Sequence, residues 1–451
     1  MRPKDPTDRG PRADAPHDMR GPLPEGRGPV RYGPPLPEAG LPVLPELAGV
    51  VAAASGRPHP EPPGGAPALL EAARGYGQRR GLTAERARVT AAPGGAPLLL
   101  ALTAALGGDV LVPRPCPAWW VPQARLLGRE VFHVPTPAEC GGVPDLYALL
   151  ETVRRVRAEG GDPRLLVLSV ADDPTATVPP PEVLHAAVEA AAGEGLHVVS
   201  DETWRDTLHP GTDTVLFSPA EMFPAQVTVL TELTGAYLPP SLPAACARFP
   251  PTERGDHLAD RVLDFLTATG AVLPAPVAAA ATYVLNEPEA VTARRGAAVA
   301  LHARVAAAAY RTVLAGGGLV LPPRSGRHLY VDLDPLRPAL AARGVTDAQD
   351  LEDFLTGRLG MPAPGGHRFG DDPAALRARL STGPLLGSTP EERGASLTAQ
   401  EPLELPHVAR LLARLRSALD DLGDGPGAAD PVGPARAEGD GTAGEGRESE
   451  R

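Results

Sequence analysis

Acidic and aromatic side chains stand directly after two apolar runs of this sequence. Asp173 closely follows the run Leu165–Val170. Asp201 and Trp204 follow the run Leu196–Ser200. Short apolar runs of this kind are typical of strands that a sheet buries on both faces. Because open α/β sheets bind ligands outside the carboxyl ends of their strands, the sequence predicts a ligand site at these side chains.

The stretch between the two runs predicts the helix that connects them. Pro181 is compatible with a first helical turn, and apolar residues recur at helical spacing from Val183 to Ala191. Gly193 and Gly195 mark the end of that helix. A strand, a helix and a second strand form a right-handed parallel crossover, so the chain is expected to be an α/β protein.

A glycine turn earlier in the chain suits an anion. Gly94, Gly95 and Ala96 lie between a predicted strand at 88–92 and an apolar helix at 98–106. A helix that begins at such a turn presents free backbone N–H groups and the positive end of its dipole, which favours a phosphate. Glycine turns before helices are common, so the neighbouring motifs must support this interpretation.

The composition limits the classes of partner. The chain has 451 residues and a formal net charge of -12, which argues against nucleic acid and anionic membranes as partners. Its three cysteines lack metal-ligand spacing, and no apolar stretch approaches the roughly 20 residues that span a bilayer. The first 21 residues lack the apolar region of a secretory signal. We therefore expect a cytoplasmic protein with reduced thiols and no bound metal.

Composition and element pattern divide the chain into five parts. Residues 1–40 and 423–451 are polar and rich in Gly and Pro, and we predict that both tails are disordered. The length between them is enough for two lobes. There we expect an N-terminal arm with part of the smaller domain at 41–85, a large domain at 86–310 and a small C-terminal domain at 311–422.

Two motifs resemble those of the class I and II aminotransferases. DDPTATVPP, at 172–180, is similar to the family's N-N-P-T-G turn, and VVSDETWRD, at 198–206, is similar to its D-E-x-Y strand end. These are pyridoxal-phosphate (PLP) enzymes of fold type I that exchange amino groups between amino acids and keto acids. The resemblance implies a large domain with a mainly parallel sheet flanked by helices, a smaller α/β domain, and a homodimer.

The resemblance also implies roles around the cofactor ring. Asp201 matches the carboxylate that pairs with the pyridinium nitrogen. Alternatively, Asp201 is a helix cap or a carboxylate in a surface turn. Trp120, in PCPAWW, stands where an aromatic ring stacks on the pyridine, or it is a core aromatic. Asp173 and Trp204 replace the Asn and Tyr that contact the phenolic oxygen. An ionised Asp can only accept there, whereas an indole N–H can still donate.

Further roles concern the phosphate and the substrate. By resemblance, Gly95 and Ala96 would cradle the cofactor phosphate. Arg379, in the sequence RLS, matches the arginine that binds the α-carboxylate of the substrate as a two-pronged pair. Arg377, two residues earlier, is interpreted as a surface arginine.

The family's lysine motif is missing. By resemblance, Gly235 occupies the position of the lysine that forms the Schiff base, Glu232 that of a phosphate-binding Ser, and Pro243 that of a phosphate-binding Arg. The only lysine in the whole sequence is Lys4. Glycine offers no amine, and a carboxylate at 232 opposes a phosphate. We therefore assign no catalytic residue, and PLP could be bound only non-covalently.

Three functional hypotheses remain. The first is a degenerate aminotransferase, a pseudoenzyme that acts as a ligand-binding, regulatory or partner subunit, in a homodimer or with an active aminotransferase. The second is an enzyme that holds PLP or its amine form non-covalently on Asp201 and Trp120. The third is an ordinary aminotransferase acting on an amino acid or keto acid, which the absence of the lysine opposes.

Overall fold

The computed structural model describes residues 31–423 apart from positions 36, 39, 60, 85 and 86. The disorder predicted for 1–30 and 424–451 therefore lies outside the described residues. Arg31 and Glu38, which the predicted N-terminal tail included, contact the smaller domain: the Arg31 guanidinium lies 3.2 Å from a carboxylate oxygen of Glu352, and Glu38 lies 3.8 Å from Arg379.

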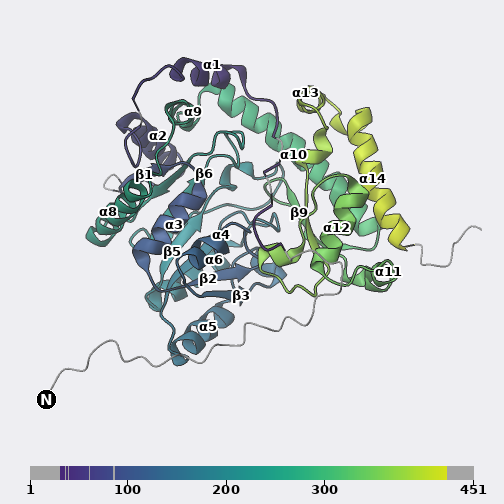
Figure 1. Ribbon diagram of the computed structural model, residues 1–451, viewed down its shortest axis with the longest axis horizontal. Helices are drawn as coiled ribbons and strands as arrows, with labels where there is room; N and C mark the ends of the chain where they lie inside the picture. The colour runs from purple at the N-terminus through teal and green to yellow at the C-terminus, as the bar shows by residue number, and fades with distance from the viewer. Residues whose placement is uncertain (1–30, 36, 39, 60, 85–86, 424–451) are drawn as a thin grey trace, which may run out of the picture.

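A seven-stranded sheet forms the centre of the larger domain (Figure 1). Its strand order is β1-β7-β6-β5-β4-β2-β3. The pair β1 and β7 and the pair β6 and β7 are antiparallel, and the remaining neighbours are parallel. The strands are β1 (Val89–Ala92), β2 (Asp109–Arg114), β3 (Val131–Pro135), β4 (Pro163–Ser169), β5 (His197–Asp201), β6 (Val227–Glu232) and β7 (Ala245–Arg248). This mainly parallel sheet confirms the predicted fold class.

The predicted crossover is present between β4 and β5. Helix α6 (Pro181–Gly193) connects them, and Ser169 pairs with Asp201 at their carboxyl ends. Along β4, Leu165 and Val167 belong to one hydrophobic cluster, whereas Leu166 and Leu168 belong to another. Both faces of the sheet are therefore buried, which explains the continuous apolar run in the sequence.

Helices cover both faces of this sheet. One cluster contains side chains of α3 (Gly95–Leu106), α4 (Trp120–Leu126) and α8 (Glu253–Ala268). The cluster on the opposite face contains side chains of α5 (Leu146–Ala158), α6 and α7 (Pro219–Met222). A third cluster joins α1 (Pro45–Ala54), α2 (Pro67–Gln78) and α9 (Ala275–Leu285).

The smaller domain is built on a three-stranded antiparallel sheet with the order β10-β9-β8. Its long helix α10 (Glu289–Ala315) starts beside the larger domain, and the boundary predicted at 310 lies within this helix. The other elements are β8 (Leu319–Val320), β9 (His328–Asp332), α11 (Arg337–Ala341), α12 (Ala348–Leu359), β10 (Arg377–Ser381), α13 (Pro390–Thr398) and α14 (Pro406–Gly423).

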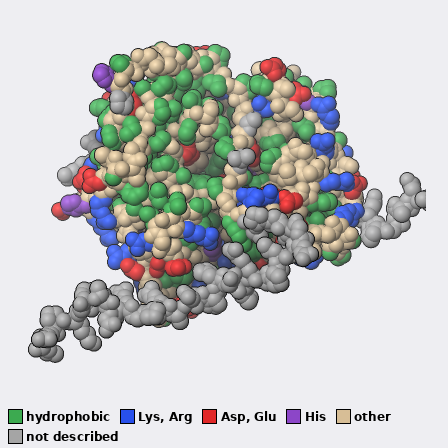
Figure 2. All heavy atoms as spheres, in the orientation of Figure 1, with side chains coloured by type: hydrophobic (Ala, Val, Ile, Leu, Met, Phe, Trp, Pro, Cys, Tyr) green, Lys and Arg blue, Asp and Glu red, His purple; other side chains and the backbone are tan. Residues whose placement is uncertain are grey.

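The surface differs between the two domains. On the face shown in Figure 2, hydrophobic side chains cover much of the larger domain, and basic side chains gather toward the outer edge of the smaller one. Among the described helices, none is long and apolar enough to cross a membrane.

Candidate functional site

Acidic side chains meet at the carboxyl ends of three neighbouring strands. Asp201 ends β5, Glu232 ends β6, and Asp173 lies in the turn after β4. Because parallel strands end at the same edge of a sheet, these side chains converge there. Asp173 and Asp201 are both buried, so each carboxylate needs a partner within the protein.

Asp201 receives two hydrogen bonds from its own chain. The indole N–H of Trp120 donates to Oδ2 at 3.1 Å, and the backbone N–H of Thr203 donates to Oδ1 at 2.9 Å. Burial raises the pKa of Asp201 to about 6, although these hydrogen bonds oppose the shift. Trp120 is itself a core residue, packed among the side chains of α3 and the sheet. The indole thus caps the carboxylate edge-on, through its nitrogen.

Glu232 occupies the start of helix α3. Its Oε2 accepts a hydrogen bond from the backbone N–H of Gly95, and its Oε1 accepts one from the Thr234 hydroxyl at 3.1 Å. Gly94 precedes the helix with a φ of 115°, a conformation that glycine adopts without strain. Ala96 follows in the first turn and is half-buried. The glycine turn before a helix that the sequence predicted is therefore present, and its Gly95 N–H donates to a carboxylate of the same chain.

Arg379 is paired with Asp173 across the two domains. Its Nη1 lies 2.9 and 3.2 Å from the two carboxylate oxygens of Asp173, and its guanidinium carbon lies 5.0 Å from the centre of the Phe369 ring. Strand β10 supplies the arginine, and the turn after β4 supplies the carboxylate. The arginine predicted to bind a substrate carboxylate already binds a carboxylate of the protein.

The backbone at Gly235 leaves no room for a side chain. A Cβ atom built there would lie 2.5 Å from the carbonyl oxygen of Thr203 and 2.8 Å from its Cγ2. Both values are below normal van der Waals contact, so a larger residue at 235 requires the backbone to move.

Trp204 faces the start of β9 in the smaller domain. Its ring meets the ring of His328 edge-to-face at 5.1 Å, and the Arg327 guanidinium carbon lies 5.0 Å from the Trp204 ring centre. Arg327, which directly precedes β9, was given no role in the sequence analysis.

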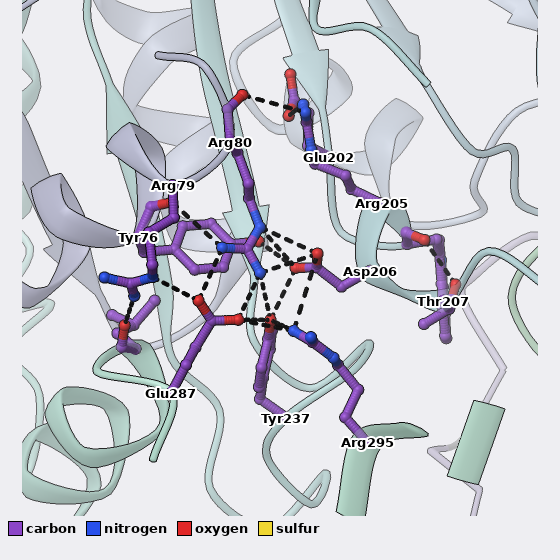
Figure 3. Close-up of polar contacts among 12 residues, drawn as sticks. Tyr76, Arg79, Arg80, Glu202, Arg205, Asp206, Thr207, Tyr237, Glu287 and Arg295 are labelled. Carbon is purple, nitrogen blue, oxygen red and sulfur yellow. Dashed lines mark hydrogen bonds and ion pairs between the residues drawn. The ribbon is translucent and has the colours of Figure 1, made fainter. Parts of the chain in front are cut away.

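A second polar cluster was not predicted at all (Figure 3). Arg80 lies 2.6 Å from Glu287 and 2.9 Å from Asp206, and Arg295 lies 2.7 Å from Glu287. The hydroxyls of Tyr76 and Tyr237 both donate to Asp206, at 2.6 and 2.9 Å. Burial alone would raise the pKa of Glu287, but the hydrogen bonds from its arginine neighbours outweigh burial and hold this pKa well below its usual value. The cluster ties α2 to the junction of α9 and α10.

Comparison with protein families identifies one match. Residues 45–228 match the family described as aminotransferase class I and II. The chain is 31% identical over 194 residues to the probable aspartate/prephenate aminotransferase of Thermus aquaticus, a match that covers 42% of this chain and 48% of that protein. The aspartate/prephenate aminotransferase of Thermus thermophilus is also 31% identical, over 190 residues, or 41% of this chain and 47% of that protein. The matched region thus spans about half the length of these curated relatives.

Solved structures share the fold over most of the chain. The aspartate aminotransferase from Thermus thermophilus with maleate has a TM-score of 0.66 and 22% identity, covering 86% of this chain and 90% of that one. The aromatic aminotransferase from Pyrococcus horikoshii has a TM-score of 0.70 and 16% identity, covering 86% and 95%. At these identities the likeness shows the fold alone.

In this conformation the residues do not fit PLP, the cofactor that such a family implies. A carboxylate at the start of α3 stands where a phosphate would be held, because Glu232 already accepts from Gly95. Gly235 supplies no amine and has no space for a side chain. The carboxylate of Asp201 is capped by Trp120. The cofactor contacts predicted from the sequence remain predictions.

Proposed function

We propose that this chain, which belongs to the class I and II aminotransferase family, does not catalyse transamination by itself and acts as a non-catalytic, ligand-binding or partner subunit. One observation carries the proposal: the only lysine in the sequence is Lys4, so none lies within the described residues 31–423. By resemblance, Gly235 occupies the position of the family's Schiff-base lysine. Without an amine held at that position, the covalent step of this chemistry has no nucleophile.

The internal pairing of the polar side chains at the strand ends supports the non-catalytic part of this proposal. The carboxylate of Glu232, the carboxylate of Asp201 and the guanidinium of Arg379 each have a partner from the same chain. A ligand must break these contacts and desolvate the freed partners before it can bind, which lowers its affinity.

The test is a cofactor-retention experiment on the full chain. The protein is incubated with PLP, dialysed, and examined by visible absorbance, and a borohydride-reduced sample is analysed by intact mass. We expect no retained absorbance band and no adduct within 31–423. A retained band without an adduct would favour the non-covalent cofactor site instead. The Lys4→Arg variant is the control, because any adduct that it abolishes belongs to the N-terminal segment.

A direct assay completes the test. The purified chain is incubated with PLP, aspartate and 2-oxoglutarate, and the amino acids are quantified over hours. Turnover above the PLP-only background that survives in the Lys4→Arg variant would overturn the proposal, since no other side chain of this protein offers a primary amine.

Assembly and location form part of this proposal. We place the protein in the cytoplasm, as a homodimer or as a heterodimer with an active aminotransferase. Light scattering of the purified chain distinguishes a monomer from a dimer, and mixing it with a candidate partner enzyme shows whether the turnover or substrate affinity of the partner changes.

A further inference from the structure

We propose that a cleft between the N-terminal arm and helix α10 binds a small apolar carboxylic acid in its ionised form, with the carboxylate held between Arg294 and Arg327. The cleft has an internal volume of about 120 Å³ and is lined by Gly235, and Arg379 is not among the described residues that line it. The inference goes beyond the proposed function, because a chain that did catalyse transamination could hold this ligand as well.

One face of α10 forms a wall of the cleft. Val291, Arg294, Ala298 and His302 line it, at intervals of three or four residues. Residues at this spacing lie on the same side of a helix. The other walls come from residues 40–47 and from the loop that follows β6.

Two guanidinium groups of the cleft have no ion-pair partner among the residues that the structure describes. Arg294 donates from Nη2 to the Pro42 carbonyl at 2.5 Å, and Arg327 donates from Nη2 to the Thr234 carbonyl at 3.4 Å. The neighbouring Arg295 differs, because it lies 2.7 Å from Glu287. Carbonyl groups compensate a full positive charge only in part, so both guanidiniums favour an anion.

The surroundings make both positive charges costly to bury without an anion. None of the residues that line the cleft within the described chain is acidic. Burial lowers the pKa of Arg294, and it lowers the pKa of Arg327 more than Glu38 raises it. Burial and the nearby Arg327 lower the pKa of His302 to about 3, so the imidazole is neutral at physiological pH. The positive charge of the cleft therefore comes from its arginines.

The remaining walls favour an apolar body on the ligand. Aliphatic side chains form much of the remaining lining of the cleft, and a strongly hydrated inorganic anion would gain nothing from them. A carboxylate matches the planar guanidinium in shape and charge. These apolar walls include Leu41, Val43, Leu44, Leu238, Val291 and Val299.

The experiment is calorimetric titration of the full chain with sodium hexanoate at low ionic strength, beside hexanamide and inorganic phosphate. We expect hexanoate to bind, and hexanamide and phosphate to bind at least tenfold more weakly. Arg294→Gln and Arg327→Gln should each raise the dissociation constant for hexanoate roughly tenfold, the effect of losing one charged hydrogen bond. Arg154→Gln is the matched control, because Arg154 is exposed on α5. This variant should leave the dissociation constant for hexanoate within twofold of the wild-type value.

Two further variants keep the test decisive. Ala298→Leu fills the cleft without removing charge and should also weaken hexanoate binding at least tenfold. This variant still tests the cleft if Arg294→Gln or Arg327→Gln does not fold. Arg379→Gln distinguishes this cleft from the site at the strand ends. Loss of hexanoate binding in Arg379→Gln, with binding retained in the cleft variants, would overturn the proposal. Absence of hexanoate binding to the wild-type chain at about 50 mM, roughly fiftyfold above a dissociation constant of about 1 mM, would also overturn the proposal.

Discussion

Replacing Glu232 by serine should turn the start of α3 into an anion-binding site. In the wild-type chain the carboxylate of Glu232 accepts the hydrogen bond of the Gly95 N–H and neutralises the positive end of the helix dipole. Serine removes this charge and leaves the N–H free. The neighbouring Thr234 hydroxyl, which now donates to Glu232, becomes available as well.

The size of the effect follows from electrostatics. Two unit charges 4 Å apart repel each other by about 4 kcal/mol at an effective dielectric constant near 20. At about 1.4 kcal/mol for each factor of ten, this is nearly three powers of ten in affinity. Burial raises the pKa of Glu232, so part of this repulsion is relieved by protonation when an anion approaches. We therefore expect sulfate to bind the Glu232→Ser variant roughly 100-fold more tightly than the wild-type chain.

Calorimetric titration with sulfate at low chloride concentration measures this difference directly. Sulfate keeps its charge across the neutral range, so its own protonation does not enter the result. Glu71→Ser is the control, because Glu71 is exposed on α2 and should leave sulfate binding unchanged. Equal sulfate affinity in the wild-type and Glu232→Ser chains would refute the view that this carboxylate blocks the anion site.

Three other predictions test the same region. Arg379→Met should lower the free energy of unfolding in urea by about 3–5 kcal/mol, because the buried carboxylate of Asp173 loses its partner. Adding Asp173→Leu to this variant should restore most of the lost free energy. Wild-type stability of the Arg379→Met variant would contradict the importance of the ion pair. Gly235→Ala should cost about 1–3 kcal/mol through the clash with Thr203, whereas Gly296→Ala, in open space on α10, should be neutral or stabilising, and equal unfolding midpoints would count against the crowding at 235. The pKa of Asp201 is raised to about 6, so the folded chain binds a proton there more tightly than the unfolded chain does. This residue should therefore make the protein more stable as the pH falls from 7 to 5, and Asp201→Asn should remove that contribution. An identical pH dependence of unfolding in the wild-type and Asp201→Asn proteins would contradict the raised pKa.

The sequence alone was sufficient for the parts of the fold that depend on local pattern. The apolar run before Asp173, the helix that starts at Pro181, and a strand just before Asp201 were all expected, because hydrophobic spacing and glycine positions act over a few residues. The predicted strand at 196–200 is shifted by one residue in the structure, where β5 ends at Asp201 itself. The absence of a lysine at 235 is likewise a property of the sequence, and it alone removes the amine that Schiff-base chemistry requires. The glycine turn before α3 was also predicted, but the contact of its Gly95 N–H with the Glu232 carboxylate was not.

Only the tertiary structure decided which groups satisfy one another. Glu232 meets Gly95 across 137 residues of sequence, and Asp173 meets Arg379 across 206, so no periodicity within either segment could indicate the contact. Among the described residues, neither Arg294 nor Arg327 has an ion-pair partner, and this too is a tertiary property. The sequence does not distinguish an arginine beside a carboxylate from one that lines an apolar cleft. Local pattern determines where strands and helices form, whereas the partner of a buried charge depends on how distant elements pack, because desolvation must be compensated by whatever group the fold brings within reach.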